Sequence, residues 1–334
     1  MSYRKQGSDG LGDPLVVRYL EFVEGRARRN TVLAVSSDLG IFLSFVDKDP
    51  ATVTTDDVLR FVADQRAPRF DGKVVRLADG EAGLRASTIK RRLSSVAGFY
   101  SFLVMVEVLD RNPVPTGMAT RRPRRHRRSR VPLVRAPRLL PKVLEPVEVK
   151  ALFAALRRVR DRAMVEAMVL GGLRRCEVLG MRLQDLRPAE RRVLVAEGKG
   201  GHQRMVSISP RFFRSVAVYM QTERPENAST DRLFLVLKGP RRGHPLSEDG
   251  LEEIIRSAKG RAGLAHATCH ELRHTCFTRL REAGMALEAI QAQAGHSSIE
   301  TTRLYLHLSN DWLADEYQRA AELIDVSMLE AVAR

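Results

Sequence analysis

Two histidines, an arginine and a tyrosine in the last fifth of the chain have side chains suited to chemistry at a phosphate. They are His270, Arg273, His296 and Tyr305, separated along the chain by 3, 23 and 9 residues. An imidazole can transfer a proton, a guanidinium can bind two phosphate oxygens at once, and a phenol can act as a nucleophile. The rest of the chain must position this set on a substrate.

Tyr305 needs help before it can act as a nucleophile. A phenol has an unperturbed pKa of about 10, so ionising it near neutral pH costs roughly 4 kcal/mol. A histidine can act as the base, and arginines beside the phosphate favour the charged transition state. Ser297 and Glu300 have the spacing of a capping box, which would start the helix that carries Tyr305.

Two further basic residues lie upstream in settings that suit the same chemistry. Lys199 lies in the glycine turn 198–201 between two predicted strands, where its flexible cation can reach out as a proton donor. Arg174 follows a Gly-Gly-Leu sequence and lies three residues before Glu177. Each has an ordinary alternative: Lys199 as a solvated turn charge, and Arg174 as half of a helix salt bridge with Glu177.

The segment 270–274 also matches a different chemistry. His270, Glu271 and His274 fit H-E-x-x-H, in which two histidines one turn apart bind zinc beside a glutamate base. Against this, Arg273 would place a cation beside the bound zinc. Taken alone, the residues leave a zinc metalloprotease open as an alternative.

The chain carries a large excess of positive charge. Its 56 Lys and Arg against 40 Asp and Glu give a net charge of +16 and a pI near 10.4. Such an excess indicates a polyanionic partner, because Lys and Arg that bind phosphates release condensed counterions. Nine arginines and three prolines, with no acidic residue, lie between 121 and 138. This run is a solvated linker, or a linker that also lies along a phosphate backbone.

Apolar periodicity predicts a mainly helical chain with two folded regions. Residues 67–83 predict a loop or small hairpin, and 193–195 and 205–208 predict paired antiparallel strands. The predicted helices lie at about 13–28, 31–46, from Thr54 or Thr55, from Ser87, from Pro146, and at 160–170, 174–180, 210–222, 247–261, 269–283, 287–294, 298–308 and 311–332. The fold class is therefore mainly α with a small antiparallel β-sheet. Its predicted parts are a helical domain at 1–111, an Arg/Pro-rich linker at 112–144 and a domain at 145–334.

Other features bear on where the protein works. The three cysteines form no C-x-x-C pair, so neither a disulfide scaffold nor a cysteine zinc site is expected. No run approaches the ~18 apolar residues of a membrane span, and the N-terminus lacks the apolar core of a signal peptide. We expect a soluble, intracellular protein with no membrane partner.

The joint order of these motifs resembles that of the tyrosine recombinase, or phage integrase, family. The matching blocks cover about 145–305 and are Gly172-Leu173-Arg174 with Glu177, Gly198-Lys199-Gly200 before Arg204, His270-x-Leu272-Arg273-His274, Gly295-His296 and Tyr305. The helix from Ser87 to Tyr100 is more loosely similar to the family's core-binding helices. The resemblance implies an N-terminal SAM-like core-binding domain and a tyrosine recombinase catalytic domain that form a C-shaped clamp.

The resemblance also implies a role for each residue in site-specific DNA strand exchange. Tyr305 would attack the scissile phosphate and form a 3′-phosphotyrosyl link, while Arg174 and Arg273 hold the nonbridging oxygens. Lys199 would protonate the leaving 5′-oxygen, and His270 would act as the base toward Tyr305. No metal and no cofactor is implied, because the phosphotyrosine keeps the energy of the broken bond.

The remaining implied roles are support and DNA binding. His296 would hydrogen-bond the phosphate, and Glu177 would buttress the site. The cations at the start of the helix from Ser87 would oppose the helix dipole unless a phosphate lies nearby. The residues expected to bind DNA are Lys90, Arg91, Arg92, Arg121, Arg122, Arg124, Arg125 and Arg204.

The implied partner is a double-stranded DNA recombination site. We expect a homotetramer on two duplexes, a monomer or dimer off DNA, and accessory recombination proteins as further candidate partners. The amphipathic segment 311–334 would pack on a neighbour or within its own chain. The expected location is the bacterial cytoplasm, in association with the nucleoid. The long 67–83 and arginine-rich segments favour a mobile-element integrase or transposase; a Xer-type recombinase that resolves chromosome or plasmid dimers, or a DNA-binding protein without catalysis, are the alternatives.

Overall fold

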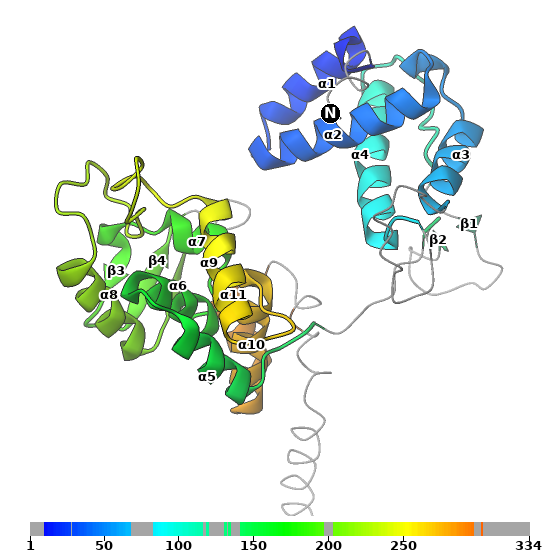
Figure 1. The fold of residues 1–334 in the computed structure, drawn as a ribbon. Helices are drawn as coiled ribbons and strands as arrows, with labels where there is room; N and C mark the ends of the chain where they lie inside the picture. Colours follow the sequence, from blue (N-terminus) through cyan, green and yellow to red (C-terminus); the bar gives the residue numbers. More distant parts are fainter. Residues whose placement is uncertain are drawn as a thin grey trace, which may run out of the picture. The chain divides into compact units, whose positions relative to one another are not determined.

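The chain divides into two compact units, Met1–Arg138 and Leu139–Arg334, each mostly helical (Figure 1). The computed structural model describes residues 10–27, 29–67, 83–115, 118–119, 130–131, 133–134, 141–196, 203–296 and 302. The predicted class, mainly α with a small antiparallel sheet, is confirmed. The predicted loop at 67–83, apart from its ends, and the predicted helices at 298–308, apart from Thr302, and 311–332 lie outside the described residues.

In the described part of the first unit, four helices, as predicted, enclose an aromatic core. Phe42 and Phe61 pack edge to face with ring centroids 5.1 Å apart, and Phe99 and Tyr100 do the same at 5.1 Å. Pairs of this kind contribute about 0.5–1.5 kcal/mol beyond the burial of their area. The helices are α1 (Pro14–Glu24), α2 (Arg29–Val46), α3 (Thr55–Arg66) and α4 (Ala86–Met105), with 3-10 turns at Gly10–Gly12 and Pro50–Thr52.

The start of α3 is fixed by the side chains that the sequence indicated. The Thr54 hydroxyl accepts a hydrogen bond from the Asp57 backbone N–H, and the Asp57 carboxylate accepts one from the Thr54 N–H at 2.9 Å. This reciprocal capping box satisfies two N–H groups that a helix start leaves without partners. The sequence placed the start of this helix at Thr54 or Thr55, and the structure makes Thr54 the N-cap and Thr55 the first helical residue.

The positive charge of the first turns of α4 is balanced by a carboxylate of the same chain, that of Asp38. Arg91 donates to the carboxylate of Asp38 on α2 at 2.5 Å, and the Ser95 hydroxyl donates to the same oxygen at 2.8 Å. Arg92 donates to the side-chain oxygen of Gln65 and lies 4.0 Å from Asp38. Asp38 is fully buried, so these contacts balance a charge that would otherwise be costly. A phosphate is therefore not needed to explain why cations start this helix.

Parts of the predicted 112–144 linker pack on the first unit. Val114 and Val134 are buried in its core, and the Asn112 side chain donates to the Ala97 carbonyl of α4 at 2.9 Å. Two short strands, β1 (Met118–Ala119) and β2 (Arg130–Val131), pair antiparallel. Apolar burial explains this packing. The two compact units meet between Arg138 and Leu139 in the sequence, and the functional division at 111 and 144 stays a prediction.

The second unit is organised around α6, whose residues are almost all buried. This helix packs against α8 and α10, and a three-stranded antiparallel sheet in the order β3-β4-β5 lies in the same unit (Figure 1). The elements are α5 (Pro146–Ala155), α6 (Val159–Val169), α7 (Arg175–Gly180), the 3-10 turn Leu183–Asp185, β3 (Leu186–Arg187), β4 (Arg192–Val195), β5 (Arg204–Ser207), α8 (Pro210–Thr222), α9 (Glu248–Arg261), α10 (Cys269–Glu282) and α11 (Leu287–Ala294). The two predicted strands correspond to β4 and β5, whereas β3 was not predicted.

Within the described ranges, no helix combines the length and apolar character that crossing a membrane requires.

Replacing Asp38 with alanine should loosen the first unit. The replacement leaves Arg91 and Ser95 without this acceptor, at a cost of about 1–2 kcal/mol because Arg91 is half-exposed. We expect faster amide hydrogen exchange in α2 and α4 and no change in α6. The matched control is Asp56→Ala, because that carboxylate is exposed and pairs with Arg60 on the surface. Equal effects of the two replacements on hydrogen exchange would contradict the claim that Asp38 stabilises the packing of α2 against α4.

Candidate active site

Five of the predicted site residues converge in the second unit. They come from the turn before α7, from α7, from the start of β5, from α10 and from the second residue after the end of α11. They are Arg174, Glu177, Arg204, Arg273 and His296, and direct contacts join them. Lys199, Tyr305, Arg121, Arg122, Arg124 and Arg125 lie outside the described residues.

The carboxylate of Glu177 is the centre of this cluster. Its side chain is fully buried and accepts hydrogen bonds from Arg174 at 2.7 Å and from both terminal nitrogens of Arg204 at 2.9 and 3.0 Å. Arg273 lies 3.9 Å away. Burial by itself would raise the pKa of Glu177, but the hydrogen bonds from Arg204 and the Arg174 backbone N–H lower it to about 2. Glu177 is therefore an anion that holds three guanidiniums.

Backbone carbonyls anchor Arg273 from two sides. Its guanidinium donates to the carbonyl oxygen of Gly172 and to that of Ala294, the latter at 2.8 Å. It also lies over the Phe277 ring, 4.8 Å from the centroid, and 3.3 Å from Nε2 of His296. Arg273 is only 4% exposed, so these contacts fix its orientation.

Two glycines let the backbone approach these arginines. Gly172 has φ +66°, and a Cβ there would meet the Phe277 ring at 2.5 Å. Gly295 has φ +60° at the end of α11, and a Cβ there would meet Arg204 at 2.9 Å. Left-handed φ values and this crowding both favour glycine. The Gly295 carbonyl accepts a hydrogen bond from Arg174 at 3.4 Å.

His296 follows Gly295 and is held from two directions. Its backbone N–H donates to the carbonyl of Gln291 at 3.2 Å, and the Gln291 side chain donates to the His296 carbonyl at 3.2 Å. Its Nδ1 lies 2.9 Å from the hydroxyl of the buried Thr302. The ring is thus oriented between Thr302 and Arg273.

His270 and His274 face each other one turn apart on α10. Their Nε2 atoms are 2.8 Å apart, and the rings stand edge to face with centroids 4.2 Å apart. Two nitrogens bound to one tetrahedral zinc stand roughly 3.3 Å apart, so the shorter distance fits a hydrogen bond better than a ligand pair. The Glu271 carboxylate lies 3.6 Å from Nδ1 of His266.

Arg204, predicted to bind DNA, contacts groups of the protein itself. Its side chain is 13% exposed, binds Glu177 with both terminal nitrogens and donates from Nε to the Gln293 carbonyl at 3.1 Å. These contacts give the guanidinium a supporting role inside the protein, and its contact with DNA stays a prediction. Lys90 and Arg91 are exposed, and Arg91 and Arg92 make the contacts with Asp38 and Gln65 described above.

Sequence reasoning missed several residues that shape the site. Gln293 donates to the carbonyls of Gly171 and Ser207, at 3.2 and 2.6 Å, and so ties α11 to β5. Thr302 and Phe277 contact His296 and Arg273. No local pattern marks Gln293, because its partners are far away in the sequence. Phe277 lies one helix turn after Arg273, and Thr302 lies six residues after His296, so local spacing was compatible with these two contacts but did not single them out. The i, i+4 spacing of His274 from His270 was visible, but it suggested zinc.

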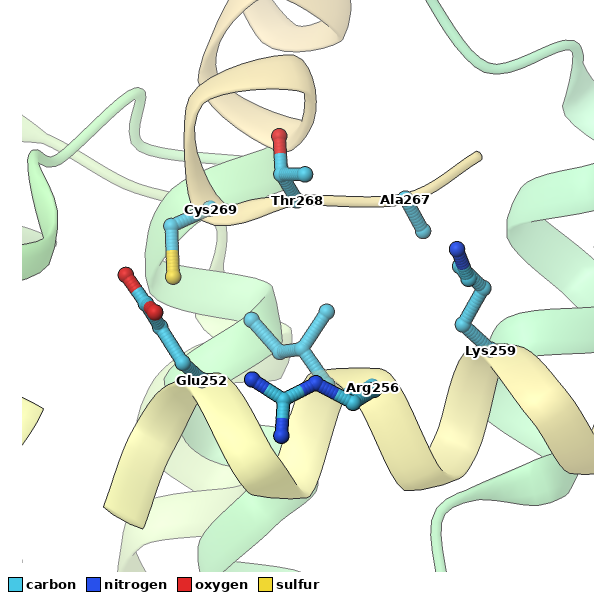
Figure 2. A pocket seen from close by; sticks show the side chains of 7 residues that line it. Glu252, Arg256, Lys259, Ala267, Thr268 and Cys269 are labelled. Atoms are coloured by element: carbon cyan, nitrogen blue, oxygen red, sulfur yellow. The ribbon is translucent and has the colours of Figure 1, made fainter. Parts of the chain in front are cut away.

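A cavity of about 220 Å³ lies beside the start of α10 and is distinct from this cluster. Glu252, Arg256 and Lys259 of α9 project toward it from one side, and Thr268 and Cys269 border it on the other (Figure 2). None of the predicted site residues lines it. The Glu177 cluster, and not this cavity, is the candidate active site.

Comparisons with known proteins agree on one family. The model of the Phage integrase family matches residues 142–311, and that of the Phage integrase N-terminal SAM-like domain matches 16–106. The chain is 30% identical to tyrosine recombinase XerC of Roseiflexus castenholzii, over 84% of each chain. It is 29% identical to tyrosine recombinase XerD of Lacticaseibacillus casei, over 91% of this chain and 96% of that one.

Solved structures show the same fold. The Tn1549 transposon integrase in complex with transposon right end DNA has a TM-score of 0.66 at 18% identity, covering 92% of this chain and 98% of that one. The XerH site-specific recombinase bound to its difH substrate has a TM-score of 0.62 at 18% identity, covering 93% and 83%.

Replacing Glu177 with glutamine should make the stability of the fold depend less on pH in the acidic range. The pKa of Glu177 is about 2 in the folded chain against about 4.5 ordinarily, so its contribution is present above pH 4.5 and is lost as the pH falls toward 2. The shift corresponds to about 3 kcal/mol. We expect Glu177→Gln to melt at a lower temperature at pH 7 and to lose less stability than the wild type below pH 4.5, measured by calorimetry.

The exposed Glu253, which pairs with Arg256 on the surface, supplies the control. Glu253→Gln should change neither the melting temperature at pH 7 nor its decrease below pH 4.5. If the melting temperature of Glu177→Gln fell below pH 4.5 as steeply as that of the wild type, the assigned role of this carboxylate would be contradicted.

Proposed function

Because this chain belongs to the phage integrase family of tyrosine recombinases, which cleave and rejoin DNA through a covalent phosphotyrosine intermediate, we propose that Tyr305 is its nucleophile in a site-specific strand exchange. DNA is accordingly its partner. The family assignment replaces the zinc metalloprotease and the DNA-binding protein without catalysis as alternatives. The observation that carries the site assignment is the cluster of Arg174, Arg273 and His296 around the buried Glu177.

The arginine cluster suits a phosphodiester in charge and in rigidity. Three guanidiniums surround one carboxylate, which leaves a net positive charge where Arg174 and Arg273 lie. Donors held in place before the reaction stabilise developing charge without reorganising, and one such donor typically contributes about 100–1,000-fold in rate. In the proposed complex, Arg174 and Arg273 bind the nonbridging oxygens, and His296 adds a hydrogen bond.

The proposed cleavage step moves one proton at each end of the reacting bond. The phenol oxygen of Tyr305 forms a bond to phosphorus as the bond from phosphorus to the 5′-oxygen breaks. His270 takes the phenol proton, and Lys199 gives a proton to the leaving 5′-oxygen. A 5′-hydroxyl from the partner duplex then attacks the phosphotyrosine and reverses these steps, so the bond count is unchanged and no cofactor is consumed.

The helical unit and the arginine-rich segment are proposed to bind the DNA backbone. We keep 1–111, 112–144 and 145–334 as the functional division into core-binding domain, linker and catalytic domain, although parts of the second segment pack on the first unit. The exposed Lys90 and Arg91 on α4, with Arg92 beside them, are proposed to contact phosphates. Arg121, Arg122, Arg124 and Arg125 are proposed to extend this contact.

Two biological roles follow from the same chemistry. The long basic segment favours integration, excision or transposition of a mobile element, as in the Tn1549 integrase that shares the fold. Resolution of chromosome or plasmid dimers is the second candidate, because the relatives at 29–32% identity are named XerC and XerD. Both roles call for a homotetramer on two duplexes, with a monomer or dimer off DNA. The sequence that flanks the gene is the observation that separates them.

Tyr305→Phe should abolish covalent attachment to DNA while leaving DNA binding intact. A suicide substrate that carries the recombination site and a nick beside the cleavage point should trap the wild type as a protein–DNA adduct, visible on a denaturing gel. The phenylalanine ring keeps the size of the side chain and removes only the attacking oxygen. Tyr219→Phe is the matched control, because that hydroxyl donates to the Leu233 carbonyl inside the core. Adducts of equal yield from wild type and Tyr305→Phe would remove Tyr305 as the nucleophile.

Removing arginines from the linker segment should make DNA binding less dependent on salt. Each lost phosphate contact lowers the slope of log K against log salt concentration by about 0.9. We therefore expect the double variant Arg121→Ala, Arg122→Ala to reduce the slope by about 0.9–1.8, measured by fluorescence anisotropy. The adjacent pair Arg241 and Arg242, exposed in the loop before α9, gives a control with the same change of charge. Equal reductions from both pairs would mean that total charge alone sets the slope.

A further inference from the structure

We propose that His274 is a positioning residue for proton transfer: it accepts a hydrogen bond from Nε2 of His270 and so leaves Nδ1 of His270 unprotonated as the base. The inference rests on the proposed role of His270 toward Tyr305. It concerns a residue to which the strand-exchange chemistry above gives no part.

The distance between the two rings requires one shared proton. The Nε2 atoms are 2.8 Å apart, too close for two lone pairs or for two N–H groups to face each other. One ring must therefore donate and the other must accept. The edge-to-face arrangement, with the ring planes at 81°, is set by the one-turn spacing of His270 and His274 on α10.

Only one of the two arrangements leaves His270 with a usable lone pair. If His274 donated, Nε2 of His270 would be occupied and its proton would sit on Nδ1. If His270 donates, its neutral tautomer carries the proton on Nε2, and Nδ1 has a lone pair for the Tyr305 phenol. After Nδ1 takes that proton, Nε2 still donates to His274, so the contact persists through the step and stabilises the imidazolium.

The charges around the pair favour a neutral His274. Burial, followed by the neighbouring His270, Arg273 and His296, lowers the pKa of His274 to about 4. Burial and Arg273 also lower the pKa of His270, Glu271 opposes this, and Arg174 adds to it. These groups come from α10, from the turn before α7 and from the residue after Gly295. Near neutral pH, His274 is therefore an uncharged ring that can accept a hydrogen bond.

In many catalytic sites a second group hydrogen-bonds to a histidine and fixes its tautomer, and the proposed pair would work in the same way. Here the second group is a neutral imidazole in place of a carboxylate. A carboxylate would raise the pKa of His270 strongly, whereas the imidazole orients the ring with little added charge. This suits a site in which Arg174 and Arg273 already provide the positive field.

The first test reads the tautomer directly and does not depend on activity. In the full-length protein labelled with ¹⁵N-histidine, long-range ¹⁵N–¹H spectra at pH 7 should show His270 protonated on Nε2. His274→Leu should convert His270 to a mixture of tautomers, while His274→Gln, whose side-chain oxygen can accept, should retain the Nε2–H form. A His270 protonated on Nδ1 in the wild type would overturn the inference.

The second test measures single-turnover cleavage of the suicide substrate from pH 5 to pH 9. His274→Leu should cleave about 10–100-fold more slowly at pH 7, and its acidic limb should move to lower pH because the imidazolium of His270 loses an acceptor. His274→Gln should recover at least part of the rate. Cys276→Ser, a buried replacement on the same helix, serves as the control for packing and should leave the position of the acidic limb unchanged.

The outcomes separate this inference from the proposed function. Covalent trapping by the wild type together with normal rates and pH profiles in both His274 variants would overturn the role of His274 and leave Tyr305 as the nucleophile. A wild type that forms no adduct would instead count against the proposed function, and the tautomer spectra would still decide the hydrogen bond. Melting temperature and DNA affinity of each variant, expected to match the wild type, distinguish lost positioning from lost folding.

Discussion

The geometry of the candidate active site depends on the contacts of one buried carboxylate, that of Glu177. An anion without partners in the interior is very costly, so this side chain requires cations around it. Its partners Arg174, Arg204 and Arg273 come from the start of α7, from β5 and from α10, which are far apart in the sequence. One charge thereby holds a turn, a strand and a helix together.

The arginines that satisfy this carboxylate are fixed by the backbone as well. Carbonyls of Gly172 and Ala294 accept from Arg273, and the Gly295 carbonyl accepts from Arg174. A side chain at either glycine would collide with Phe277 or Arg204. Cations gathered for structural reasons and held this rigidly form a preorganised positive field, which is what a phosphodiester under attack requires. Stability and chemistry thus depend on the same contacts.

The sequence predicted whatever depends on local pattern or on residue type. Apolar periodicity located α2, α4 and α10, and the capping threonines limited the start of α3 to Thr54 or Thr55, because these signals lie within one helix. The contact of Arg204 with Glu177 was not predicted, since only the folded chain brings the two together. The burial of Val114 and Val134 was missed for the same reason: the arginine-rich composition around them concealed two long-range apolar contacts.

The segment 270–274 shows how environment selects between two chemistries that one sequence permits. Two histidines and a glutamate at this spacing are compatible with a zinc site. In the fold, however, Arg273 is buried on the same helix turn. Burial lowers the pKa of both histidines most, and the charge of Arg273 lowers both further. A positive field disfavours a metal cation but favours a phosphate and a neutral imidazole that can accept a proton. The arginine inside the motif, more than the histidines themselves, therefore determines what the motif can do.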